Sequence, residues 1–406
     1  MGFDINCTRA VATMKNIFII ILILVVQQSY SASRYWVAGT GNWNSTAHWS
    51  TTSGGSTGAA VPTSSDNVYF DANSVTSGSQ TITLNATMNF LTLDFTGIAN
   101  NPTIEGNGVT ANAYGNVTFT TGFTWGGSFP AISDWYWKAT GTATLITGGK
   151  NLNYISYHHL STGCTLSLGS NVSMQGLYFE GGTLTTNNYN ITSGLGFNCL
   201  GTGGTLNLGS SLITLSNSTT DYQWNMTTAC TINAGTSTIK FSATSGTLSF
   251  INTGAAATFY DIWFSDGGTT TLAVNCASGT TFNNVTLAGS STILNTYTFN
   301  QLILSPAKTY TITTGKTLTM NWLQAIGTNG NNVSIASSTT TNATISIASG
   351  MVCEDYITLN HITATGGATF QTGVNYTDAC SGCNTGWSLG TCVRPVSAGS
   401  GFTFFR

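Results

Sequence analysis

Short runs of alternating apolar and polar residues follow one another through most of this chain. Alternation over four to eight residues predicts half-buried β-strands. Within these runs an apolar triplet with fixed spacing recurs, with starts at Met88, Tyr114, Leu152, Met174, Phe259, Phe282 and Phe299. Starts in the clearer runs lie 26, 22, 23 and 17 residues apart. A repeat of about 22 residues without helical segments predicts a solenoid of stacked strands.

The repeat predicts how such a solenoid is held together. Each coil contributes two or three short strands, and its inward apolar side chains pack on those of the next coil. Turns are expected at pairs such as Gly181-Gly182 and Asn187-Asn188, where a positive φ costs little. The alternative is a string of β-sandwiches, whose uneven loops would not produce a regular repeat.

Three segments differ from the strand repeats, which we place at 76–375. Residues 32–75 are rich in Trp, and residues 376–406 are rich in Cys and then in Gly and Ser. An open solenoid exposes an unpaired edge at each end. We therefore expect an aromatic N-terminal cap and a Cys-rich C-terminal cap.

The third segment, residues 1–31, is typical of a secretory signal peptide. Arg9 and Lys15 precede an apolar run from Ile17 to Val26, and small residues follow. Ten apolar residues are too few to span a bilayer, which takes about 20. A retained membrane anchor is the alternative, and no second apolar span follows. The sequence thus predicts a secreted, extracellular or cell-surface protein without a transmembrane span after cleavage.

The cysteine count fits this location. One of the nine cysteines, Cys7, lies in the signal segment, and eight remain. Exported proteins fold in oxidising compartments, so we expect these cysteines to form disulfides. The sequence leaves open which cysteines pair. Zinc is the alternative for the Cys380-x-x-Cys383 motif, with Cys353 or a distant His among its ligands. The disulfide candidates are Cys164, Cys199, Cys230, Cys276, Cys353, Cys380, Cys383 and Cys392.

Charge narrows the function classes. Only 6% of the residues are charged, and ten Lys and Arg against thirteen Asp and Glu give a net charge of −3. Ten basic residues cannot form the phosphate-neutralising stripe of a nucleic-acid partner. The chain carries no H-E-x-x-H motif and no phosphate loop. We therefore expect no nucleic-acid partner and no cofactor.

Aromatic residues supply the first candidate binding site. Trp125, Trp135 and Trp137 fall in an irregular insertion at 121–138, and loops on rigid scaffolds often carry function. Trp135 and Trp137 would share one face of a strand, with Tyr136 on the other. Such rings bind sugars or apolar partners well. Packing on the solenoid flank is the alternative.

The predicted outward face supplies the second candidate. Tyr178 and Trp263 stand on it, and it is uncharged and rich in hydroxyl and aromatic groups. A solvated sheet of good strand formers is the alternative. The column runs through Thr92, Thr118, Ser156, Tyr178, Trp263, Thr286 and Ile303.

A catalytic alternative rests on carboxylates. Polysaccharide-cleaving enzymes use paired carboxylates, and Asp261 and Asp266 flank Trp263. Asp also serves commonly in turns. His158 and His159 are neighbours that would face apart on a strand, so they do not form a metal pair.

The N-terminal segment has a distinctive pattern of Trp36, Gly39, Gly41, Trp43 and Trp49, followed by Pro62, Asp66, Val68 and Phe70. This pattern resembles the opening of secreted bacterial or phage β-strand-repeat proteins, which are adhesin-like. A closing Asn384-Thr385-Gly386-Trp387 is similar to the end of such modules. The resemblance implies a right-handed parallel β-helix and an extracellular role, and it carries over no catalytic residue.

These observations lead to one expectation about function. The chain is predicted to be a secreted cell-surface or matrix protein of adhesin-like, non-catalytic type that contacts polysaccharide or cell-surface glycans. The alternative is a polysaccharide lyase or glycoside hydrolase on the same scaffold. Trp36, Trp43 and Trp49 could also stack on sugars, but we expect them to form the hydrophobic cap.

Overall fold

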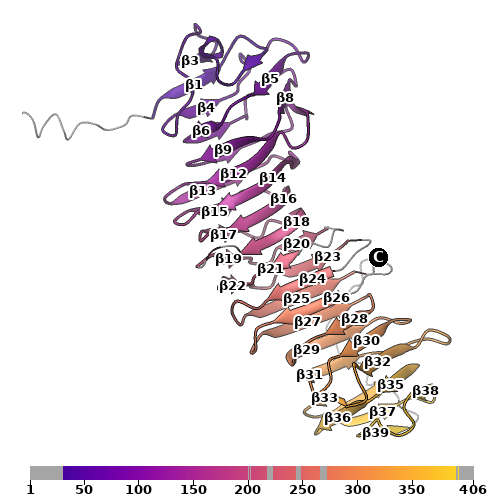
Figure 1. Cartoon of the computed structure of the whole chain (residues 1–406). Coiled ribbons are helices and arrows are strands. Elements are labelled where there is room, and N and C mark those ends of the chain that lie inside the picture. Colours follow the sequence, from indigo (N-terminus) through magenta and orange to yellow (C-terminus); the bar gives the residue numbers. More distant parts are fainter. Residues whose placement is uncertain are drawn as a thin grey trace, which may run out of the picture.

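The described residues of this computed structural model form an elongated stack of short strands (Figure 1). They are residues 31–199, 201, 203–216, 223–243, 248–265, 272–389 and 392, so the signal segment lies outside them. The stack is a parallel β-solenoid of about 13 turns, which confirms the predicted fold class. Its helical content among these residues is one 3-10 turn, Thr46–His48.

The walls of the solenoid are long ladders of parallel strands. Among the described strands, the one antiparallel pairing joins β1 and β3 at the N-terminal end. The first ladder contains β1 (Ser33–Trp36), β3 (Trp49–Ser50), β4 (Asn67–Tyr69), β7 (Thr92–Asp94), β10 (Val117–Thr118), β13 (Thr142–Ile146), β15 (Thr165–Leu168), β17 (Thr183–Thr185), β19 (Thr205–Asn207) and β22 (Thr231–Asn233). The second contains β2 (Gly41–Asn42), β5 (Thr81–Leu84), β8 (Thr103–Gly106) and β11 (Thr124–Gly127).

The third and largest ladder runs almost the full length of the stack. Its strands are β6 (Met88–Phe90), β9 (Val109–Ala113), β12 (Ile132–Trp137), β14 (Leu152–Leu160), β16 (Val172–Phe179), β18 (Ile191–Cys199), β20 (Leu212–Leu215), β21 (Trp224–Asn225), β23 (Thr238–Phe241), β24 (Leu248–Asn252), β25 (Thr258–Phe264), β26 (Leu272–Cys276), β27 (Thr281–Leu287), β28 (Ser291–Ile293), β29 (Tyr297–Leu304), β30 (Thr309–Ile312), β31 (Thr317–Gln324), β32 (Val333–Ser337), β33 (Ala343–Ile347), β35 (Ile357–Asn360), β36 (Ile362–Gly366) and β38 (Tyr376–Asp378). The ladder divides at β18, which pairs with both β20 and β21, and two series of parallel strands continue from there.

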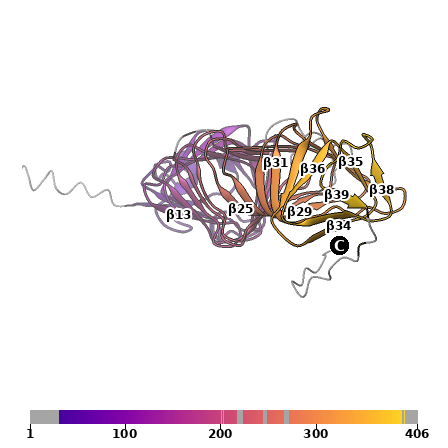
Figure 2. The same ribbon diagram turned by 90° about the horizontal axis from the view of Figure 1, so that it is seen from below.

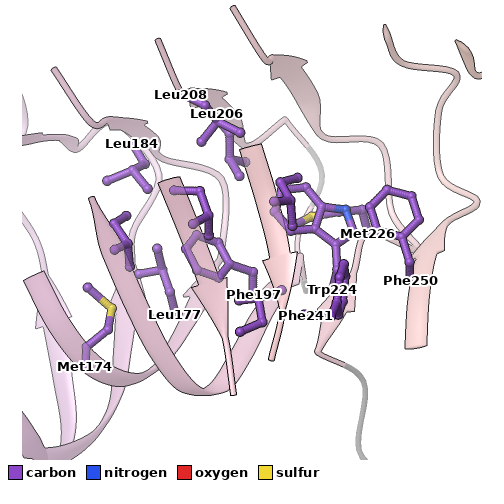
Figure 3. Close-up of a cluster of buried hydrophobic side chains, with 14 of the residues drawn as sticks. Met174, Leu177, Leu184, Phe197, Leu206, Leu208, Trp224, Met226, Phe241 and Phe250 are labelled. Carbon is purple, nitrogen blue, oxygen red and sulfur yellow. The ribbon is translucent and has the colours of Figure 1, made fainter. Parts of the chain in front are cut away.

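The core follows from the alternation of apolar and polar positions. In β17 the side chain of Leu184 is buried between two half-buried threonines. Parallel register then sets like residues above one another, as Leu184 pairs with Leu206. Figure 3 shows both leucines on the inner side of the coil beside the aromatic stack that contains Phe197 and Trp224. Each coil thus buries its apolar residues against its neighbours.

An aromatic cluster closes the N-terminal end. The rings of Trp36 and Trp49 meet edge to face at 5.2 Å, and those of Trp43 and Trp49 at 4.9 Å. All three indoles are buried, and Phe70 packs against them. The predicted hydrophobic cap is confirmed, and these indoles do not present a sugar-stacking platform.

The C-terminal end has its own small sheet of β34 (Met351–Glu354), β37 (Thr369–Thr372) and β39 (Trp387–Leu389). Figure 2 places β34 and β39 in the foreground, with β34 below β31 and β36. Phe370 and Trp387 meet at 5.1 Å, and the Cys353–Cys392 disulfide joins the last described residue to β34.

Six of the eight disulfide candidates are bonded, as Cys199–Cys230, Cys353–Cys392 and Cys380–Cys383. The prediction is wrong for Cys164 and Cys276, which are free and buried. Cys164 lies just before β15 and Cys276 ends β26, so many coils separate the two thiols along the stack (Figure 1). Burial raises the pKa of Cys164 to about 11 and that of Cys276 to about 12. Both therefore stay protonated and act as small apolar core residues.

Gly196 allows two coils to approach closely in β18. Its φ is +105°, and a Cβ there would lie 2.3 Å from the backbone oxygen of Gln223. We expect Gly196→Ala to lower the free energy of unfolding by about 1–3 kcal/mol, because strain and a clash are both introduced. Gly141→Ala is the matched control, since a Cβ at Gly141 meets open space. Denaturant unfolding would measure both, and equal stabilities would contradict this account of the close approach.

Candidate functional site

Aromatic rings gather on the outer face of three neighbouring strands, β12, β14 and β16. Their parallel register aligns Tyr136 with His159 and His159 with Tyr178. Side chains alternate between the faces of a strand, so Trp135 and Trp137 point inward while Tyr136 points outward. The outward positions of three successive coils therefore form one row of rings.

The rings in this row are in contact. The Tyr136 and His159 rings stack at 4.4 Å, and the His159 and Tyr178 rings lie 5.3 Å apart. Tyr157 joins the group, with its ring 4.8 Å from that of Tyr178. The result is a contiguous aromatic surface across three coils.

Two carboxylates hold the central imidazole. His159 Nε2 lies 3.0 Å from Asp134 Oδ1, and its Nδ1 lies 2.9 Å from Glu180 Oε1. The imidazole is 11% exposed, whereas the carboxyl side chains are 34% and 38% exposed. A neutral imidazole has one N–H and donates to one carboxylate, whereas the imidazolium donates to both. In either form the imidazole is therefore fixed in place between the two carboxylates.

We call the rings and carboxyl groups described above the outer patch. Burial of Tyr136, together with the nearby carboxylates of Asp134 and Glu180, raises the pKa of the Tyr136 hydroxyl, which therefore stays a hydrogen-bond donor. The Lys138 ammonium lies 5.1 Å from the centre of the Tyr136 ring. The outer patch consists of Asp134, Tyr136, Tyr157, His159, Tyr178 and Glu180.

Asparagine side chains extend the row in both directions. Asn112 Nδ2 donates to Asn89 Oδ1 at 3.0 Å on one side, and Asn225 Nδ2 donates to Asn198 Oδ1 at 3.2 Å on the other. At about 4.8 Å per coil, seven aligned positions span about 29 Å. The row is Asn89, Asn112, Tyr136, His159, Tyr178, Asn198 and Asn225.

The prediction that Trp135 and Trp137 bind a ligand is wrong. They do share a face, but it is the inner one, where they are 1% and 0% exposed. The predicted insertion at 121–138 instead contains β11 and β12, which pair in the ladders. Trp125 is half-buried against Phe123 and donates its Nε1–H to the Asn151 backbone oxygen at 3.0 Å. Its role in binding stays a prediction.

The predicted outward column is wrong as a single row. Thr92 and Thr118 belong to the first ladder, whereas Tyr178 and Trp263 belong to the third. Tyr178 lies in the outer patch. Trp263 is 38% exposed on β25, where the Lys240 ammonium lies 4.1 Å from its ring centre. A spacing pattern alone did not distinguish one wall from another.

The structure describes one residue of the predicted catalytic pair, Asp261. Asp261 accepts a hydrogen bond from Asn284 Nδ2 at 2.8 Å, and burial raises its pKa. Asp266 lies outside the residues that the structure describes. The pairing of Asp261 with Asp266 therefore stays a prediction.

Sequence reasoning missed Asp134 and Glu180 and did not use His159. Asp134 lies 25 positions before His159, and Glu180 lies 21 positions after it. Both spacings are close to one repeat, which was the available signal in the sequence. The prediction that His158 and His159 face apart is confirmed, since His158 lies inside against Trp137.

Comparisons with known proteins found no relative. No protein-family model matches the chain, and neither the curated proteins nor the solved structures contain a significant match. Within the described part of the chain, no helix has the length and apolar character needed to cross a bilayer.

Proposed function

We propose that this protein is a secreted, non-catalytic surface or matrix protein of adhesin-like type whose outer patch binds a polysaccharide. The observation that carries the proposal is the row of contacting rings on β12, β14 and β16. The signal-like segment and the resemblance of the Trp-rich opening to bacterial adhesin-like repeat proteins support the extracellular setting.

A polysaccharide suits the chemistry of this row. Apolar faces of sugar rings pack on aromatic rings, and sugar hydroxyls bond to amides and carboxylates. The row combines both kinds of group and continues through Asn198 and Asn225 along the axis. A linear glycan can follow it over several sugar units. The partly exposed carboxyls of Asp134 and Glu180 favour a neutral or basic glycan over a polyanionic one.

The double variant Tyr157→Ala/Tyr178→Ala is expected to weaken polysaccharide binding at least tenfold, because central aromatic residues dominate such contacts. Retention of the purified chain on a panel of immobilised neutral, basic and acidic polysaccharides would measure this effect. Tyr260→Ala is the matched control, since Tyr260 is exposed on β25 away from the patch. Unchanged retention of the double variant, or no retention of the wild type on any polymer, would contradict the proposal.

Cleavage of the bound glycan is a second candidate, favoured by the Asp134–His159–Glu180 arrangement. Glycosidases use two carboxyl groups on opposite sides of the scissile bond. Here, however, the imidazole lies between the carboxyls and occupies that position. Release of reducing or unsaturated ends that is lost in His159→Gln would support cleavage and contradict the non-catalytic role.

A further inference from the structure

Potential metal ligands from two parts of the chain meet in the C-terminal cap. Cys380 and Cys383 lie in the loop after β38, and His361 lies between β35 and β36. A ring nitrogen of His361 and the two sulfur atoms lie within 4.8 Å of one another. All three residues are half-buried. The cysteines form a disulfide in this structure.

The surroundings orient these groups. The His361 backbone N–H donates to both sulfurs, at 3.1 Å to Cys383 and 3.4 Å to Cys380. Its ring Nδ1 lies 2.7 Å from Asn360 Oδ1, so an Nδ1–H donated there leaves the Nε2 lone pair for a metal. Asp378 shapes the loop, since its carboxylate accepts the backbone N–H of Cys380 at 3.1 Å and that of Gly382 at 2.7 Å.

The loop that carries the cysteines is anchored to the solenoid. Asn384 Oδ1 accepts the backbone N–H of Ile362 at 2.8 Å, and Asn384 Nδ2 donates to the Leu359 backbone oxygen at 3.0 Å. Both bonds link the segment after Cys383 to the strands that flank His361. The three ligands therefore keep their mutual position without depending on the disulfide alone.

We propose that reduction of the Cys380–Cys383 disulfide opens a zinc site formed by both thiolates and His361. Water completes the coordination as the fourth ligand. A dithiol supplies two electrons and two protons, becomes a disulfide itself and leaves two thiols on this loop. Zn²⁺ then displaces the two thiol protons. Two sulfurs and one imidazole, with the cysteines three residues apart, are a donor set that Zn²⁺ prefers.

Cobalt titration of the full chain tests this proposal. Co²⁺ occupies zinc sites and gives thiolate-to-metal absorption only when cysteines bind it. The chain would be reduced with excess dithiol, and the dithiol would then be removed under anaerobic conditions. The reduced chain would be titrated with Co²⁺ and then with Zn²⁺. We expect this absorption at one Co²⁺ per reduced chain, its loss on adding Zn²⁺, and at least tenfold weaker binding by the oxidised chain.

Variants assign the ligands. His361→Ala retains both cysteines and should bind Co²⁺ at least tenfold more weakly, and Cys380→Ser/Cys383→Ser should lose the absorption. Cys353→Ser/Cys392→Ser is the matched control, because it removes the other C-terminal disulfide and should keep the site. Thermal melting checks the folding of each variant. A reduced wild type without the absorption, or His361→Ala binding as tightly as the wild type, would overturn the proposal.

Discussion

Trp224→Ala is expected to lower the free energy of unfolding by about 3–5 kcal/mol, the usual cost of truncating a buried aromatic residue. The indole is fully buried and lies in a stack between Phe197 and Phe250, at 5.7 Å and 5.9 Å (Figure 3). A solenoid is held together by contacts between neighbouring coils. The cavity left by the indole would therefore weaken the packing between neighbouring coils in the middle of the stack.

Denaturant unfolding followed by circular dichroism would measure this loss. Trp263→Ala is the matched control, because Trp263 is on the outer face and partly exposed. Its expected cost is below about 1 kcal/mol. Equal losses for the two variants would contradict the assignment of Trp224 to the inner face and Trp263 to the outer face.

Acid is expected to destabilise the protein through His158. Burial, and next the neighbouring His159, lower the pKa of His158 to about 3 from its usual value of 6.5. Between these values the unfolded chain binds a proton that the folded chain does not. The contribution of neutral His158 is therefore fully present above about pH 6.5 and is lost as the pH falls toward about 3. The loss is about 1.4 kcal/mol per pH unit, or about 2 kcal/mol at pH 5.

His158→Phe separates this effect from that of the carboxylates. The free energy of unfolding would be measured from pH 8 to pH 4 for the wild type and the variant. The variant also loses the hydrogen bond from Trp137 Nε1 to His158 Nδ1, so the slope with pH is the readout. We expect the variant to have the shallower slope below pH 6.5. Parallel curves would show that His158 does not titrate on unfolding.

The fold could be predicted because its physical cause is local and repeated. Alternation in segments such as Thr183–Thr185 sets which side chains are buried, and the repeat length sets how coils stack. The position of a residue on a particular wall could not be predicted, since loop lengths vary from coil to coil. Thr92 and Tyr178 share a sequence pattern and still lie on different ladders.

The site was predicted only in part for the same reason. Residue type suggested that Trp135 and Trp137 bind a ligand, but a strand has two faces and large aromatic rings fill a core well. The outward residue between them, Tyr136, belongs to the row instead. Asp134 and Glu180 come together with His159 only through the register of three strands. In the sequence alone, the spacing of about one repeat between these residues was the available indication that they lie together.

The central claim is that a polysaccharide lies along the outer patch, and radical footprinting tests it most directly. Hydroxyl radicals would label the chain alone and in the presence of a polysaccharide that retains the chain, at a saturating concentration. The account predicts that labelling of Tyr157 and Tyr178 falls severalfold, while that of the exposed Tyr189 and Tyr260 stays unchanged. Bound polysaccharide that leaves Tyr157 and Tyr178 fully labelled would contradict it.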